Sequence, residues 1–368
     1  MSRILKSPAK YVQGKDTMKE LDRYLQGMGK HLMVLQTAGG IRRNAETLNA
    51  CFADKGYTVD EQEFSGECTR AKIEAWARRC RDTGITAVVG IGGGKVLDTA
   101  KGVAHYADLP VVIVPTVCAT DAPCSSLSVM YTDEGVFDAY LFLDTCPNVV
   151  IVDTAIIAKA PVKLLVAGMG DAMATWFEAR ACRTSGSNNQ VHGKPTCAAT
   201  GLAKMCWETL KADGLNARRA VEVGVVTPAL ENIIEINTYL SGVGFESGGL
   251  AAAHGIQKGF TVIPELHEAL HGEKVAFCTL TQLVLENAPA VEMEDVLRFC
   301  VSVGLPVCFA DLGYENVEMD AVRRAAEKAC VPGSTIHNLP FEVTADMVAE
   351  ALLAADMIGK AYKAEYGA

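Results

Sequence analysis

The sequence predicts an N-terminal α/β domain followed by an all-α domain. Short β-branched runs alternate with helical patterns over about the first 150 residues, whereas only long helical patterns follow beyond about residue 160. The chain has 368 residues, enough for two domains with a core each. Hydrophobic residues make up 49% and charged residues 21%, as in ordinary globular proteins. We therefore expect domains at residues 1–160 and 161–368.

Four apolar runs in the first domain have the length and composition of strands. They lie at 31–36, 86–91, 111–116 and 148–153. Helical patterns at 47–57 and 68–84 fall between them. Strand, helix and strand at this spacing indicate a parallel sheet with right-handed crossovers, and strands that are almost wholly apolar indicate helices on both faces.

The second domain shows helical periodicity in every long segment and no sustained series of strands. A pattern with Pro161 at its start runs over 161–182. The other helical patterns lie at 198–212, 227–242, 274–288, 294–304 and 344–366. This half of the chain therefore predicts a helical domain.

The overall charge and the cysteines restrict the class of protein. A net charge of −10 offers no basic surface for nucleic acid or an anionic membrane. No apolar run reaches the length of a membrane span, and the N-terminus lacks the apolar core of a secretory signal. The 13 cysteines include no CxxC pair, which indicates thiols in a reducing compartment. We expect a cytoplasmic protein.

A glycine run follows the predicted strand at 86–91. Gly92, Gly93 and Gly94 precede a helix that starts near Lys95, so backbone N–H groups and the helix dipole meet at one place. This arrangement suits a pyrophosphate. The run matches neither a Walker A loop nor GxGxxG, and the alternative is a tight strand-to-helix turn.

Polar side chains also gather after the strand at 111–116, where open α/β sheets bind their ligands. They are Thr116, Thr120, Asp121, Ser125 and Ser126. A simple polar connector is the alternative interpretation.

Three ionisable residues lie in apolar segments of the second domain, where an unpaired charge is costly. They are Asp171, His254 and His271. Two histidines and one carboxylate suit Zn²⁺ and, less well, Fe²⁺, and three protein ligands leave a position open for catalysis. His271 also ends HEALH (267–271), which matches a zinc-protease signature if both histidines share a helix face.

The whole chain resembles the glycerol dehydrogenases of the iron-containing (group III) alcohol dehydrogenase superfamily. The resemblance rests on SPAKYVQGKD (7–16), GIGGGKVLDTAK (90–101), TDAPCSSLSVMY (120–131), GDAMATWFEARA (170–181), VVTPALE (225–231), YLSGVGFESGGLAAAH (239–254), HGEKVAF (271–277) and TIHN (335–338). It implies a Rossmann-like domain and a helical metal-binding domain, in the architecture shared with dehydroquinate synthase, with the active site in the cleft between them. It also implies NAD-linked oxidation of glycerol to dihydroxyacetone, or the reverse reaction, in a homo-octamer.

The resemblance further assigns roles to individual residues. The metal ligands correspond to Asp171, His254 and His271, which makes HEALH a coincidence. Iron-using relatives carry a histidine where this chain has Thr175, so the resemblance favours zinc. Cofactor contacts map onto Gly93, Gly94, Lys95, Asp98, Thr116, Ser125, Leu127 and Tyr131. Polyol contacts map onto Asp121 and the metal ligands, with Phe245 shaping the pocket.

Several positions depart from the family pattern. Thr37 stands where relatives carry an aspartate for the adenosine ribose, and Arg42 and Arg43 follow it, so NADP is an alternative cofactor. Cys118, Gln257, Lys258 and Cys278 also depart from the pattern. A paralogue acting on another diol or hydroxyketone, a lyase or cyclase of the dehydroquinate synthase type, and a non-catalytic binding protein remain alternatives.

Overall fold

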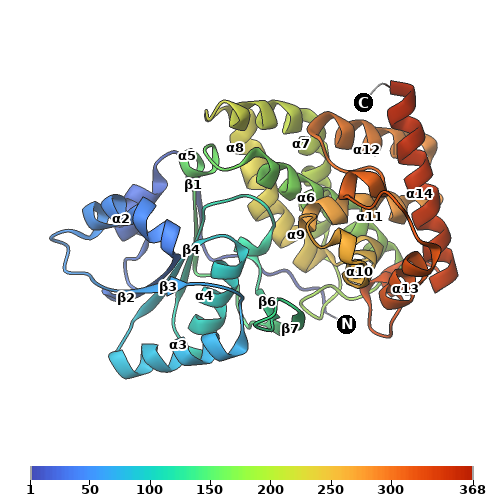
Figure 1. The fold of residues 1–368 in the computed structure, drawn as a ribbon. Coiled ribbons are helices and arrows are strands. Elements are labelled where there is room, and N and C mark those ends of the chain that lie inside the picture. Colours follow the sequence, from blue (N-terminus) through green and yellow to red (C-terminus); the bar gives the residue numbers. More distant parts are fainter. Residues whose placement is uncertain (1, 367–368) are drawn as a thin grey trace. The chain divides into compact units, whose positions relative to one another are not determined.

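The computed structural model describes residues 2–366, which form two compact units (Figure 1). One unit comprises Lys6–Pro161 together with Ala220–Gly242. Of the described residues, the other unit comprises 2–5, 162–219 and 243–366. Each unit is therefore discontinuous in sequence. Within residues 2–366, no helix combines the length and apolar character needed to cross a bilayer.

The first unit is built on a six-stranded parallel sheet with the order β1-β8-β5-β4-β2-β3. The strands are β1 Tyr11–Gly14, β2 His31–Thr37, β3 Thr58–Phe64, β4 Ala87–Gly92, β5 Val111–Pro115 and β8 Val149–Asp153. All residues of β4, β5 and β8 are buried. The four strands predicted from sequence are confirmed.

The two edge strands were not predicted. β3 has the sequence TVDEQEF and is largely exposed, while β1 has only four residues. An edge strand needs no apolar run because one side of it faces solvent, so β3 carries a weak hydrophobic signal.

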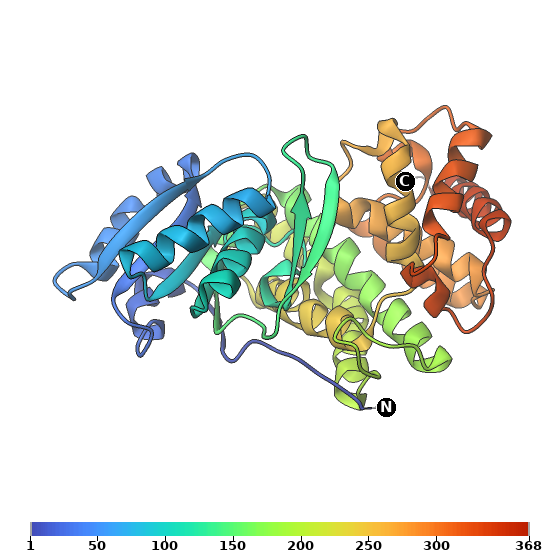
Figure 2. The same ribbon diagram turned by 90° about the horizontal axis from the view of Figure 1, so that it is seen from below.

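Helices α1 Leu21–Tyr24, α2 Ala38–Phe52, α3 Arg70–Thr83 and α4 Gly94–Ala107 lie between strands, and α5 Thr154–Ile157 follows β8. Figure 2 shows α3 and α4 side by side. The predicted helix at 47–57 is wrong in position, because α2 begins at Ala38, where the Thr37 hydroxyl accepts a hydrogen bond from Gly40 N. It ends before Asp54, which has a positive φ of 56°.

An antiparallel hairpin, which was not predicted, follows β5 in the segment that begins with the predicted cluster of polar side chains. Its strands are β6 Leu127–Tyr131 and β7 Phe137–Phe142. The 3₁₀ turn Ala122–Cys124 precedes it, and Gly135, at φ 81°, lies in the turn between the strands. The helix α8 Pro228–Glu235 and the π-helical turn Ile236–Leu240 also belong to this unit.

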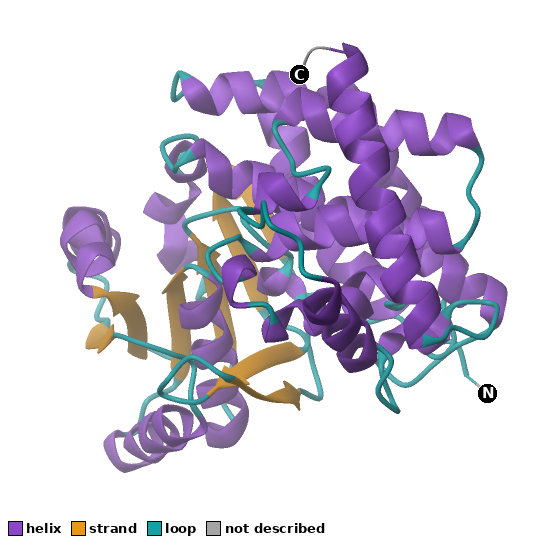
Figure 3. Cartoon of the chain, turned by 45° about the vertical axis from the view of Figure 1, so that its right-hand side comes forward, coloured by secondary structure: helices purple, strands orange, loops and turns teal. Residues whose placement is uncertain are grey.

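The second unit is helical, as predicted, and Figure 3 shows the strands gathered in the other unit. Its helices are α6 Val162–Ser185, most of α7 Cys197–Glu222 and of α9 Ser241–Gly248, α10 Ala252–Gly259, α11 His271–Leu285, α12 Ala290–Val303, α13 Met319–Ala329 and α14 Ala345–Tyr366. The backbones of α6 and α11 touch, because a Cβ on Gly272 would overlap the carbonyl oxygen of Ala167. This close packing fixes the position of Asp171 on α6 relative to His271 on α11.

Candidate metal and nucleotide sites

The three predicted metal ligands come together in the helical unit. Asp171 lies mid-way along α6, His254 lies in α10 and His271 is the first residue of α11. Their ligand atoms all lie within 4.8 Å of one another. Asp171 Oδ1 is 3.4 Å from His254 Nε2 and 3.3 Å from His271 Nε2. Tetrahedral zinc with bonds of about 2.0–2.2 Å requires ligand separations of about 3.3–3.6 Å, so the spacing fits a metal ion.

The carboxylate of Asp171 is buried and faces the imidazole nitrogens of His254 and His271. The side chain is 1% exposed, and neither oxygen makes a hydrogen bond of normal geometry to any described residue. Burial alone would raise the pKa of Asp171, but the adjacent His271 and His254 outweigh it and hold that pKa below its ordinary value. A buried charged carboxylate facing two imidazole nitrogens is what a divalent cation needs. The side chain of His271 is 38% exposed, so solvent reaches the site.

Two buried side chains around His254 were missed by the sequence analysis. Glu178 lies on α6 and Gln282 on α11, and both are fully buried. Glu178 Oε2 is 2.5 Å from His254 Nδ1. The sequence signal for Glu178 was its distance from Asp171, because a residue seven positions further along a helix lies on the same face two turns later.

HEALH does not form a helix. His267 follows the 3₁₀ turn Pro264–Leu266, and α11 begins only at His271. The exposed His267 ring contacts the carbonyl oxygen of Thr261 through Nε2, at 3.2 Å. The two histidines therefore share no helix face, and the prediction that the motif is a coincidence agrees with this geometry.

The glycine run forms the predicted turn from β4 into α4. Gly93 is the N-cap residue of α4 and Gly94 is its first residue. A Cβ on Gly92 would lie 2.8 Å from Val96 Cγ2, so Gly92 permits the close packing of strand and helix. A Cβ on Gly93 or Gly94 would meet only ordinary contacts within the protein, at 3.6 Å and 3.9 Å. No packing constraint explains these two glycines, which is consistent with a ligand lying against their backbone.

A buried lysine ties α4 to the segment that precedes and begins the hairpin. Lys101 Nζ lies 2.9 Å from Asp98 Oδ1, donates to Ala122 O at 2.9 Å and to Ser125 Oγ at 3.4 Å, and also donates to Leu127 O. The other oxygen of Asp98 accepts from Val129 N at 3.1 Å. Three predicted cofactor residues, Asp98, Ser125 and Leu127, thus belong to one network centred on Lys101.

The remaining predicted cofactor and substrate residues make the following contacts. Lys95 pairs with Glu67 at 2.5 Å, and Thr116 N donates to Gly92 O at the end of β4. Burial raises the pKa of Tyr131 to about 12. Asp121 Oδ2 accepts from Ser241 Oγ at 2.9 Å. Phe245 is buried in α9.

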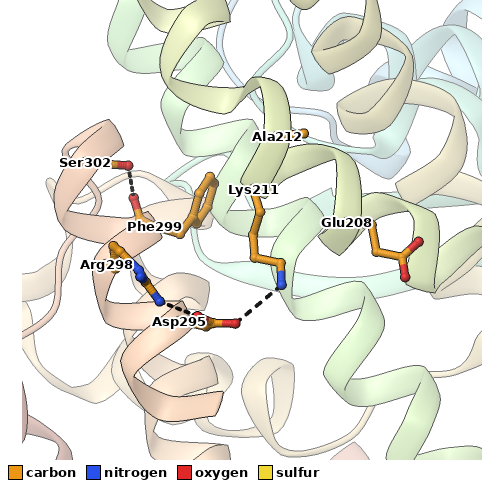
Figure 4. A pocket seen from close by; sticks show the side chains of 7 residues that line it. All are labelled: Glu208, Lys211, Ala212, Asp295, Arg298, Phe299 and Ser302. Carbon is orange, nitrogen blue, oxygen red and sulfur yellow. Dashed lines mark hydrogen bonds and ion pairs between the residues drawn. The ribbon is translucent and has the colours of Figure 1, made fainter. Parts of the chain in front are cut away.

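A separate surface recess of about 480 Å³ lies between α7 and α12 (Figure 4). It is lined by Glu208, Lys211, Ala212, Asp295, Arg298, Phe299 and Ser302. Asp295 pairs with both Lys211 and Arg298, and Glu208 pairs with Lys204 on α7. The recess contains none of the predicted site residues.

A parallel sheet with a glycine turn suits a dinucleotide, and a buried Asp-His-His set suits a catalytic metal, a combination that indicates a metal-dependent dehydrogenase. Residues 8–154 match the family model described as iron-containing alcohol dehydrogenase. A glycerol dehydrogenase from Escherichia coli O6:H1 is 50% identical over 366 residues, covering 100% of both chains. A glycolaldehyde reductase from Halobacterium salinarum is 42% identical over 98% of this chain and 99% of its own.

A solved structure agrees with these relatives. The crystal structure of glycerol dehydrogenase from Schizosaccharomyces pombe superposes with a TM-score of 0.95 at 35% identity, covering 100% of this chain and 93% of that one. The chain therefore belongs to the iron-containing alcohol dehydrogenase family and, within it, to the glycerol dehydrogenases.

Proposed function

We propose that this enzyme oxidises glycerol to dihydroxyacetone, and catalyses the reverse reaction, with NAD as cofactor and Zn²⁺ held by Asp171, His254 and His271. The observation that carries the proposal is the buried Asp171 carboxylate, whose Oδ1 lies 3.3 and 3.4 Å from two imidazole nitrogens. The names of similar enzymes support glycerol as the substrate. The oxygen and nitrogen donors suit zinc.

When bound, zinc supplies a Lewis acid for the substrate hydroxyl, and NAD supplies the hydride acceptor. Asp171, His254 and His271 fix the position of the metal through three helices. The exposed side of His271 leaves room for a substrate oxygen beside the ligand set. Asp121, oriented by Ser241, accepts a hydrogen bond from a free hydroxyl of the polyol, and Phe245 shapes the pocket.

The cofactor contacts follow from the glycine turn. The backbone N–H groups at Gly93 and Gly94 and the start of α4 bind the pyrophosphate. Lys95, Thr116 and Tyr131 complete the contacts, together with the network that contains Asp98, Ser125 and Leu127.

NADP is a second candidate because of the end of β2. Thr37 is exposed there and its hydroxyl already caps α2, so no carboxylate is present at this position to bind a ribose 2′-hydroxyl. Arg42 and Arg43 are exposed, and Arg43 Nη1 lies 3.1 Å from where a Cβ on Gly39 would be. A guanidinium folded back to the start of α2 would favour a 2′-phosphate.

The substrate could also be another diol or hydroxyaldehyde, as the 42% identical glycolaldehyde reductase indicates. Cys118 and Cys278 are buried, at 1% and 0% exposure. Of the four departures Cys118, Gln257, Lys258 and Cys278, only Gln257 and Lys258 are partly exposed. A change of substrate would therefore act through these two positions.

A lyase acting on a phosphorylated substrate is disfavoured by Lys274, one of the two lysines close in sequence to the metal ligands. Its Nζ donates to Leu266 O at 3.2 Å, and burial lowers its pKa. A partly buried ammonium that already donates to a backbone carbonyl has fewer N–H groups left for a phosphate.

The test is a set of initial rates on zinc-loaded enzyme. Glycerol, 1,2-propanediol, dihydroxyacetone and glycolaldehyde are each assayed with NAD(H) and with NADP(H). Rapid NAD-linked turnover of glycerol and dihydroxyacetone is the expected result. Preference for NADP(H) would replace the cofactor assignment, and turnover of glycolaldehyde alone would replace the substrate. Absence of turnover on every substrate would refute the proposed activity.

The octamer is proposed from the family resemblance, and the location and the excluded partners from the charge and the cysteines of the sequence. We expect a cytoplasmic homo-octamer that binds neither nucleic acid nor membrane. Light scattering coupled to size-exclusion chromatography would measure the mass, and a monomer or dimer at working concentration would contradict the octamer.

A further inference from the structure

The N-terminus of α10 is capped by side chains from two other helices. Ala251 N and His254 N donate to Glu178 Oε1, at 2.8 and 3.0 Å. Ala252 N and Ala253 N donate to Gln282 Oε1, at 3.1 and 3.0 Å. The first backbone donors of this buried helix are therefore satisfied without any side chain of α10 itself.

Glu178 makes one contact that Gln282 does not. Its second oxygen, Oε2, lies 2.5 Å from His254 Nδ1. A charged carboxylate can only accept hydrogen bonds, so Nδ1 must carry the hydrogen. His254 Nε2 is then the nitrogen that gives up its proton to bind a metal, and it lies 3.4 Å from Asp171 Oδ1.

We propose that Glu178 is a positioning residue for the metal site, which fixes both the tautomer and the orientation of the His254 imidazole. One carboxylate thereby anchors the helix that carries the ligand and orients the ligand ring. A carboxylate that accepts from a ligand histidine also makes the metal-binding nitrogen more basic. The inference rests on the proposed metal site and is independent of the identity of the substrate.

The competing interpretation is that Glu178 only caps α10. Gln282 distinguishes the two interpretations, because it caps the same helix while its amide nitrogen donates to Phe177 O and Glu286 Oε1 and not to the His254 imidazole. A purely structural role predicts the same consequences for loss of either residue. A positioning role predicts that only Glu178 affects metal affinity beyond its effect on stability.

The experiment compares Glu178→Gln with Gln282→Ala in the full chain. In Glu178→Gln, the amide oxygen can still accept from Ala251 N and His254 N, but the NH₂ group cannot accept from Nδ1–H. We expect zinc to bind about 10–100-fold more weakly, measured by competition with a chromophoric chelator. The melting temperature of the metal-free variant should fall less than that of Gln282→Ala, because the amide still caps α10 and loses only the charge facing His254. The visible spectrum of the cobalt(II)-loaded variant should shift.

Gln282→Ala should behave in the opposite way, with a lower melting temperature, wild-type zinc affinity and an unchanged cobalt spectrum. Glu178→Asp restores an acceptor for Nδ1–H and should bind zinc more tightly than Glu178→Gln. Wild-type affinity in Glu178→Gln would overturn the inference. So would parallel losses of affinity and melting temperature in both variants. A wild-type chain that bound no zinc would overturn the metal site itself, whatever these variants did.

Discussion

The substitution Gly272→Ala should weaken zinc binding, because it pushes α6 and α11 apart and so separates Asp171 from His271. A Cβ there would overlap the carbonyl oxygen of Ala167 and would lie 2.6 Å from its carbonyl carbon and 3.1 Å from Asp171 N. These are backbone atoms, so no side chain can rotate away. Because carbon atoms pack at about 3.5–4.0 Å, the helices would have to separate by roughly 1 Å.

That displacement acts directly on two ligands, since Gly272 follows His271 and Ala167 lies one turn before Asp171. The 3.3 Å between Asp171 Oδ1 and His271 Nε2 would become about 4.3 Å, outside the tolerance of about 0.2 Å per metal–ligand bond. Zinc binds to four-ligand structural sites with an apparent free energy of about 10–16 kcal/mol. Loss of one ligand should therefore cost roughly 3 kcal/mol of binding free energy, or about 100-fold in affinity. Overpacking should lower the free energy of unfolding by about 1–3 kcal/mol.

Zinc competition and urea unfolding of the metal-free protein would measure the two effects. The control is Gly201→Ala on α7, where a Cβ meets no atom within 4 Å. It should leave zinc binding unchanged and raise stability by about 0.4–1 kcal/mol through the unfolded state. If Gly272→Ala bound zinc as the wild type does, the close packing of α6 and α11 would not control the site and the reasoning would fail.

Two further outcomes follow from buried charges. Lys101→Met should lower the free energy of unfolding by about 3–5 kcal/mol, because the buried Asp98 is left without its cation. The same change should raise the KM for NAD, because Lys101 also holds the segment at Ala122, and it should leave zinc affinity unchanged. Urea unfolding and steady-state rates would check this, and an unchanged KM would contradict it. Burial lowers the pKa of His254, but Glu178 and Asp171 outweigh it and hold that pKa well above 6.5. The metal-free protein should therefore lose stability as the pH rises from about 6.5 through that pKa, while its affinity for zinc increases. A melting temperature, measured in EDTA, that stays constant or increases over this pH range would refute the prediction.

The sequence carried the signals that are local to one element. The apolar runs located β2, β4, β5 and β8, because strands buried on both faces must be apolar throughout. The glycine run predicted the turn into α4 for a similar reason, since only residues without a side chain allow close approach. The identities of Asp171, His254 and His271 were also visible, because ionisable residues in apolar helices are rare.

Tertiary structure decided what depends on two elements meeting. The sequence contains HEALH, but only the late start of α11 at His271 shows that its two histidines share no helix. Glu178 and Lys101 were unremarked charged residues in the sequence, yet both are buried because their partners come from elsewhere in the chain. Periodicity reports which face of an element is buried, whereas the partner of a buried polar group is fixed by packing alone. The sequence thus determined which residues could bind the metal, and the packing of α6, α10 and α11 decided how they are held.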